Sequence, residues 1–215
     1  MLGEAALTDA DSARYFDAYK SALLHLASTS GPHQPLQDSP ALSVKLSALP
    51  PRYEYAQNDR CVPALTERMI ELCEIASAAN SGLTIDAEEA DRLEVSLLVF
   101  ERLLAASPDA TWAGLGLAVQ AYQRRALAAL SWISEAAQTH RRRIAVRLVK
   151  VAYWDSEIKR AQALGLADYP VFTRKEHTDI SYLAAARFLL ERSDHIYPQF
   201  ATHNAHTAAT IAHMA

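Results

Sequence analysis

The chain has 215 residues, the length of one domain, with 21 basic and 25 acidic side chains and a formal net charge of −4. This mild acidity argues against a general nucleic-acid-binding protein, and a hydrophobic content of 50% argues against a disordered chain. No apolar run reaches the roughly 18 residues that span a bilayer, and the first ten residues lack a signal-peptide pattern. We therefore expect a cytoplasmic protein.

Strand-like apolar runs alternate with segments of helical spacing along the whole chain. The strand-like runs cover residues 1–7, 41–49, 83–87, 114–122, 144–154 and 196–202. Helical spacing covers residues 9–27, 63–80, 88–106, 124–139, 155–163 and 177–192 and resumes at 206, whereas 28–40 reads as a loop. If Cys61 and Cys73 share one helix, they stand about 18 Å apart, which is beyond disulfide reach, so we expect free thiols.

Alternating strands and helices predict an α/β fold with a parallel sheet. No strand carries the glycine fingerprint of a dinucleotide-binding sheet, so we favour a (β/α)8 barrel, in which functional residues follow the strands. About six strands, all parallel, are expected where a closed barrel needs eight. The barrel is therefore expected to be incomplete.

Polar residues interrupt or end these apolar runs. They are Lys45, Asp86, Gln120, Arg147 and Lys150, with the pair His203-Asn204 ending the last run. Parallel strands are buried on both faces, so each polar group needs a reason to be there.

Two readings stay open for the first two of these residues. Lys45 is either a salt-bridged lysine at a barrel mouth or a functional cation, which would bind an anionic substrate or form a Schiff base. Asp86 can be the N-cap of the helix expected near Glu88, a functional carboxylate at the end of its strand, or both at once.

The later segments suggest anion binding. An arginine inside the run IAVRLV is costly to bury without an anionic partner, which makes Arg147 a functional candidate. Arg174 and Lys175 precede a predicted helix, where two basic side chains suit a phosphate. His203 has no second ligand at metal-binding spacing, so we expect no metal.

Six longer segments, in this order, resemble the flavin-dependent proline dehydrogenase domain of the bifunctional proline-utilisation enzymes. They are 43–54 (SVKLSALPPRYE), 83–94 (LTIDAEEADRLE), 119–125 (VQAYQRR), 147–160 (RLVKVAYWDSEIKR), 170–182 (PVFTRKEHTDISY) and 197–207 (YPQFATHNAHT). The resemblance covers essentially all 215 residues. It implies a distorted (β/α)8 barrel that binds FAD and oxidises L-proline to Δ1-pyrroline-5-carboxylate by hydride transfer to the flavin N5.

The resemblance also implies roles for single residues. Lys45, Asp86 and Tyr153 match active-site positions, with Lys45 near the proline carboxylate and Tyr153 against the substrate ring. The residues that match flavin-contacting segments are Gln120, Arg147, Val149, Lys150, Ala152, Trp154, Thr173, Arg174, Lys175, Thr202, His203 and Asn204. In the family, electrons pass to a membrane quinone, which implies peripheral membrane contact for the longer enzyme and no nucleic-acid contact from this domain.

Three departures from the family pattern are visible. Val151 stands where the family usually has Gly, and Pro50 stands where it has His. The family continues with two further strands and a helix that bears two adjacent arginines and a glutamate, so we expect residues 1–215 to be a partial barrel domain, truncated at both ends, that oxidises proline poorly. The alternatives are a non-catalytic remnant of the domain and, from the residues alone, a lysine-dependent aldolase-type barrel that uses Lys45 or Lys150.

Overall fold

A computed structural model describes residues 2–29, 35–106 and 111–215 of the chain. The strands are β1 (Ala41–Val44), β2 (Gly82–Ile85), β3 (Leu115–Gln120), β4 (Ile144–Val149) and β5 (Ile196–Phe200). The α-helices are α1 (Asp9–Thr29), α2 (Asn58–Ala78), α3 (Leu93–Ala106), α4 (Ala126–Thr139), α5 (Trp154–Ala163), α6 (Lys175–Leu190) and α7 (Ala205–Met214). Short 3₁₀ turns cover Leu36–Asp38, Leu46–Ala48, Tyr55–Gln57 and Ala90–Arg92.

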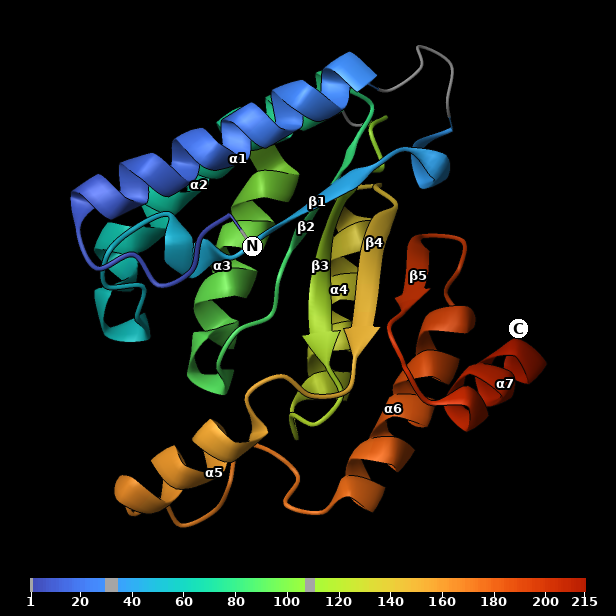
Figure 1. The fold of residues 1–215 in the computed structure, drawn as a ribbon. Helices are drawn as coiled ribbons and strands as arrows, with labels where there is room; N and C mark the ends of the chain where they lie inside the picture. The colour runs from blue at the N-terminus through green and yellow to red at the C-terminus, as the bar shows by residue number, and fades with distance from the viewer. Residues whose placement is uncertain (1, 30–34, 107–110) are drawn as a thin grey trace. The chain divides into compact units, whose positions relative to one another are not determined.

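The chain divides into two compact units, and the first comprises Met1–Asp86 and Asp91–Gly116. In this unit β1 pairs with β2 in parallel, from Ala41 opposite Gly82 to Val44 opposite Ile85. Helices α1 and α2 lie side by side, and α2 also packs against α3 (Figure 1). One face of α2 is fully buried through Leu65, Met69, Leu72 and Ala76, which recur at helical spacing.

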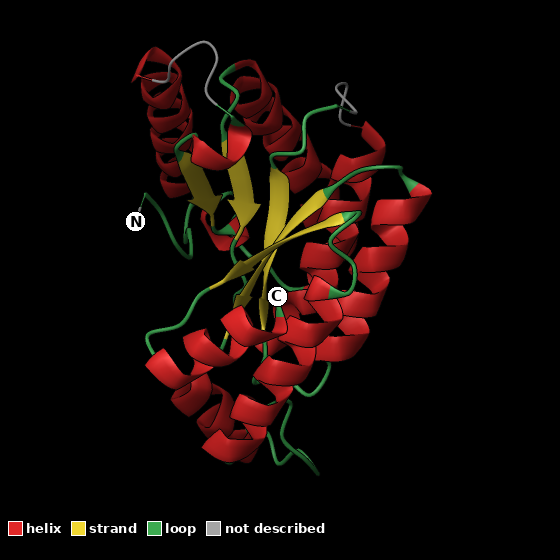
Figure 2. Ribbon diagram, turned by 90° about the vertical axis from the view of Figure 1, so that its right-hand side faces the viewer, coloured by secondary structure: helices red, strands yellow, loops and turns green. Residues whose placement is uncertain are grey.

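The second unit comprises Ala87–Ala90 and Leu117–Ala215. Here β4 and β5 run in parallel, from Ile144 opposite Ile196 to Leu148 opposite Phe200. Helix α6 packs against both of these strands and also contacts α4 and α7, so helices cover one face of the β4–β5 pair (Figure 2).

Strand β3 starts in the first unit and ends in the second. The Leu83 N–H donates to the carbonyl of Gly114, just before β3, and the Ala121 N–H, just after β3, donates to the carbonyl of Val149. The strand order is accordingly β1-β2-β3-β4-β5. All six residues of β3 are buried, as expected for an inner parallel strand.

The α/β class with parallel strands is confirmed, and three details differ from the sequence prediction. Over the described residues the sheet has five strands, because Leu2–Leu7 forms no strand. The run 41–49 leaves the sheet after Val44 and buries Leu46 in a 3₁₀ turn, so its apolar character reflects burial and not pairing. Helix α2 begins at Asn58 and contains Pro63, whose missing N–H removes one hydrogen bond, to the carbonyl of Asp59, from the second turn of the helix.

No helix over the described ranges combines the length and the apolar character needed to cross a membrane.

Candidate functional site

Lys45 and Asp86 follow the ends of two paired strands in the first unit. Val44 and Ile85 are register partners, and the Asp86 N–H donates to the carbonyl of Val44 at 2.9 Å. Two sequence-predicted residues 41 positions apart are thereby brought to the carboxyl edge of the β1–β2 pair. In a parallel sheet this is the edge at which functional groups gather.

The Lys45 ammonium forms an ion pair with the carboxylate of Glu4. The Lys45 side chain is only 15% exposed, and its backbone N–H donates to the hydroxyl of Tyr19 at 3.3 Å. The salt-bridged interpretation of Lys45 is therefore correct, and it leaves the functional one open. Sequence reasoning missed Glu4, whose only signal was a charge inside the apolar run 1–7.

Asp86 does not occupy the N-cap position that the sequence allowed. The helical segment after β2 begins with the 3₁₀ turn at Ala90, four residues beyond Asp86. The N-cap interpretation was therefore wrong, because a capping side chain belongs to the residue directly before the helix.

In the second unit, one face of β4 is left partly open. Val146 and Leu148 are fully buried, whereas Arg147 and Val149 alternate with them on the opposite face and are half-buried. Arg147 is therefore less completely buried than expected, because its face of β4 is buried at Ala145 but only partly covered at Arg147 and Val149. A partly open face with a guanidinium on it can receive a planar anionic group.

Lys150 sits in a polar network directly after β4. Its ammonium donates to Asp179 at 2.7 Å and to the Thr207 hydroxyl at 3.0 Å, and it lies 5.5 Å from the ring centroid of Tyr182. Hydrogen bonds from Lys150 and then from Lys175 lower the pKa of Asp179, so this carboxylate is ionised at neutral pH. Asp179 was missed by sequence reasoning, although its i,i+4 spacing from Lys175 on α6 was a usable signal.

Gln120 ends β3 and is almost completely buried, at 2% exposure. Its side-chain amide donates to the carbonyl of Ala87 at 3.4 Å and accepts from Gln123 at 2.6 Å. The side-chain oxygen of Gln123 is buried without a hydrogen-bond partner. A ligand that placed a hydrogen-bond donor beside Gln120 would satisfy this buried acceptor.

The segment from Val151 to Trp154, which leads from β4 into α5, carries three further predicted residues and the departure at Val151. Tyr153 precedes α5 and is half-buried, and the indole of Trp154 donates to the carbonyl of Phe172 at 2.8 Å. Ala152 is exposed. Val151 is half exposed and is not among the described residues with positive φ, so a backbone conformation reserved for glycine is not required there. Only the added bulk of Val151 remains as a difference from the family pattern.

Thr173, Arg174 and Lys175 are exposed at the start of α6. Lys175 is the first residue of that helix, and its ammonium pairs with Asp179. The positive end of the α6 dipole and the Arg174 and Lys175 side chains make this an anion-attracting position.

Thr202, His203 and Asn204 connect β5 to α7. Asn204 is the N-cap of α7, where its side chain accepts the N–H of Thr207 at 3.0 Å. The Thr202 hydroxyl accepts the Asn204 N–H at 3.1 Å, and His203 is exposed. Because Thr207 also receives the Lys150 ammonium, the β5–α7 connection and the end of β4 share one network.

Ser134, His195 and Asp194 form a row of polar side chains in the order of the Ser-His-Asp triad of hydrolases, away from the carboxyl ends of the strands. The Ser134 hydroxyl is 2.7 Å from His195 Nε2, and an Asp194 carboxylate oxygen lies 2.7 Å from Nδ1 of the same imidazole. Ser134 is 5% exposed on the packed face of α4, so a substrate cannot reach it. This row of side chains connects α4 to the residues just before β5, and its role is structural.

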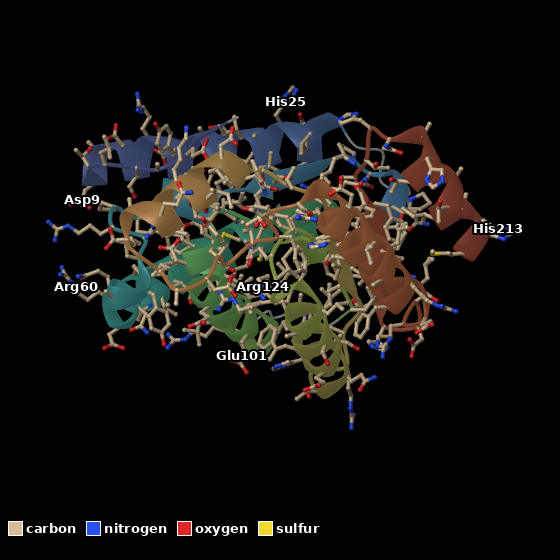
Figure 3. The ribbon with its side chains drawn as sticks, turned by 90° about the horizontal axis from the view of Figure 1, so that it is seen from below. Asp9, His25, Arg60, Glu101, Arg124 and His213 are labelled. Atoms are coloured by element: carbon tan, nitrogen blue, oxygen red, sulfur yellow. The ribbon has the colours of Figure 1, made fainter. Side chains whose placement is uncertain are left out.

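Over the described parts of the chain, no three His, Cys, Asp or Glu side chains are grouped to hold a metal ion. The histidines labelled on α1 and α7, His25 and His213, project outward from their helices (Figure 3).

The comparisons with known proteins agree on one family. The whole chain, residues 1–215, matches the family model described as proline dehydrogenase. The bifunctional protein PutA of Salmonella typhimurium is 51% identical over all 215 residues, and PutA of Escherichia coli is 49% identical over the same length. The chain spans only 16% of the length of either relative.

Solved structures give the same result. The chain is similar to a D779W mutant of Bradyrhizobium japonicum proline utilization A, with a TM-score of 0.97, 51% identity and coverage of all of this chain and 22% of that one. Proline utilization A from Bdellovibrio bacteriovorus, inactivated by N-propargylglycine, gives a TM-score of 0.90 at 28% identity, covering 99% of this chain and 23% of that one.

Proposed function

The chain belongs to the proline dehydrogenase family, a flavin-dependent family of oxidoreductases, and from this premise we propose that it binds FAD and oxidises L-proline to Δ1-pyrroline-5-carboxylate. The observation that carries the proposal is the gathering of the predicted polar residues directly after parallel strands within each unit: Lys45 and Asp86 in the first, and the β4, α6 and α7 segments in the second.

The residues of the second unit fit a flavin dinucleotide in their chemistry. Arg147 offers a guanidinium on the open face of β4, and the orphaned oxygen of Gln123 beside Gln120 can accept from a ring N–H. Arg174 and Lys175 at the start of α6 suit the pyrophosphate. When bound, the flavin supplies hydride acceptance at its N5 atom. Arg147 would stabilise negative charge on the reduced ring.

The substrate side of the proposal concerns three residues. Lys45 supplies a cation for the proline carboxylate, and Glu4 holds that ammonium in place. Asp86 supplies a carboxylate at the same strand edge. Tyr153, half-buried before α5, supplies an aromatic face for the pyrrolidine ring.

The structure weighs against the aldolase alternative. Imine formation requires a neutral amine, whereas Lys45 is paired with Glu4 and Lys150 with Asp179. The non-catalytic alternative is favoured by one observation, the half-exposed Val151 side chain in a predicted flavin segment. Transfer of electrons to a quinone at a membrane surface, and a cytoplasmic location, belong to the proposal for the longer enzyme.

The test begins with purified chain incubated with FAD and dialysed. A flavin absorption band should remain with the protein, and anaerobic L-proline should bleach it whereas D-proline should not. Lys45→Met should weaken the response to proline at least tenfold, because a charge-assisted contact contributes roughly 1.5–3 kcal/mol. Lys159→Met, which changes an exposed lysine on α5, is the matched control. A protein that retains flavin but is not reduced by proline would favour the non-catalytic alternative, and a colourless protein would refute FAD binding.

A further inference from the structure

Helix α5 carries a buried carboxylate that none of the roles above explains. Glu157 lies in the first turn of α5 and is 4% exposed, and its backbone N–H donates to the carbonyl of Tyr153 at 2.9 Å. Burying a carboxylate is costly unless hydrogen-bond donors meet it. The group that Glu157 binds therefore indicates its role.

Glu157 binds the backbone of the segment that follows Asp86 in the chain. Its Oε1 atom accepts the N–H of Ala90 at 2.6 Å. Two other side chains of the second unit hold the same segment: Arg125 donates to the carbonyl of Ala90 at 2.7 Å, and Gln120 to the carbonyl of Ala87 at 3.4 Å. Both ends of residues 87–90 are thereby fixed by side chains.

The surroundings of Glu157 strengthen this arrangement. The neighbouring Tyr122 is fully buried, and burial, followed by the negative charge of Glu157, raises the pKa of its phenol. The phenol is therefore neutral at physiological pH. A hydrogen bond to a carboxylate shielded from water is stronger than one at the surface.

We propose that Glu157 is a positioning residue that fixes segment 87–90 and, through it, the peptide that leads out of Asp86. On its other side, Asp86 is held by its backbone hydrogen bond to Val44. Because Glu157 sits one turn after Tyr153, it ties the start of α5 to this segment. The consequence for catalysis rests on the proposed function, whereas the fixing of segment 87–90 does not depend on flavin or proline.

The first test is hydrogen exchange of the flavin-free chain. In Glu157→Ala, the Ala90 amide should exchange at least about tenfold faster than in the unmutated chain, because its acceptor is removed. Glu157→Gln keeps an acceptor oxygen and should restore slow exchange. Asp155→Ala, which removes the exposed acid of the same helical turn, should leave the Ala90 amide unchanged.

Unchanged exchange in Glu157→Ala, equally fast exchange in Glu157→Gln, or equally fast exchange in Asp155→Ala would each overturn the proposal. If Glu157→Ala does not fold, Arg125→Met removes the hydrogen bond to the Ala90 carbonyl and should also accelerate hydrogen exchange of the amides of residues 87–90. In the FAD-loaded chain, the KM for L-proline should rise at least about tenfold in Glu157→Ala and recover in Glu157→Gln. Absence of turnover in every form would count against the proposed function, and the exchange result would still decide the role of Glu157.

Discussion

Replacing Asp179 by Asn tests the network after β4 most directly. The carboxylate of Asp179 binds two ammonium groups: Lys150, whose side chain is 19% exposed, and Lys175, which is 73% exposed. A charge-assisted hydrogen bond in a half-buried site contributes roughly 1.5–3 kcal/mol, about twice a neutral one, so an Asn that still accepts from Lys150 loses about half of this. The exposed i,i+4 pair adds only about 0.3–0.5 kcal/mol.

The expected loss is therefore about 1–2 kcal/mol in the free energy of unfolding at pH 7, measured by urea denaturation. Glu191→Gln is the control, because the Glu191 carboxylate is exposed and its pairs with Arg187 and Arg192 are surface pairs that should each be worth less than about 0.5 kcal/mol. A change in Asp179→Asn no larger than that of Glu191→Gln would refute the assignment of Asp179 as the main counter-ion of Lys150.

The pH dependence gives a second check on the same pair. The pKa of Asp179 is lowered in the folded chain, so its ionisation stabilises the fold above the unfolded-state pKa of about 4. This contribution is lost as the pH falls through the lower, folded-state pKa. The stability difference between the unmutated chain and Asp179→Asn should accordingly be constant from pH 7 to pH 5 and shrink below about pH 4. A difference that grows on acidification would contradict the argument.

Three further outcomes are expected. Arg147→Ala should weaken FAD binding at least tenfold in a fluorescence titration, because a lost charge-assisted contact costs roughly 1.5–3 kcal/mol. The control Arg143→Ala should leave the FAD affinity unchanged. Equal FAD affinities of Arg147→Ala and the unmutated chain would show that Arg147 does not contact the flavin. Tyr182→Phe should lower stability by about 1 kcal/mol at pH 8, because its buried hydroxyl bonds backbone carbonyls. Burial raises the pKa of Tyr182 to about 12, so its neutral form stabilises the fold below pH 10. The difference in the free energy of unfolding between the unmutated chain and Tyr182→Phe should therefore disappear between pH 10 and 12. A difference that grows over this pH range would contradict the argument. Val151→Gly should raise FAD affinity while lowering stability by about 0.5–1 kcal/mol, and unchanged affinity would show that the valine does not obstruct the flavin.

The sequence was most informative where burial is two-sided. Strand β3 was predicted within two residues at its ends, because an inner parallel strand reads as a continuous apolar run. The same signal misled at 41–49, since Leu46 and Leu49 are buried in a turn and its exit as completely as any strand residue. An apolar run indicates that a segment is buried, but it does not show whether that segment forms hydrogen bonds with a neighbouring strand.

The candidate site was predictable only in part, for a related reason. Motifs located Lys45 and Asp86, but their acidic and backbone partners come from sequence positions that no local pattern connects to them. Glu4 lies 41 residues before Lys45, and Glu157 lies 67 residues after Ala90. Whether Arg147 would be buried depended on which face of β4 the helices cover, which periodicity along one strand does not reveal.

The way the two units share the chain has a practical consequence for protein engineering. Residues 87–90 are assigned to the second unit although both flanking stretches belong to the first, and the boundary at Gly116 and Leu117 falls inside β3. No single cut separates the units, so a split-protein pair or a segmental-labelling ligation at residue 116 would sever a strand. It would also leave residues 87–90 on one fragment and their Arg125 and Glu157 anchors on the other. Two such halves would regain their native contacts only on reassembly, which makes recovery of fold from the fragments a direct measure of how interdependent the two units are.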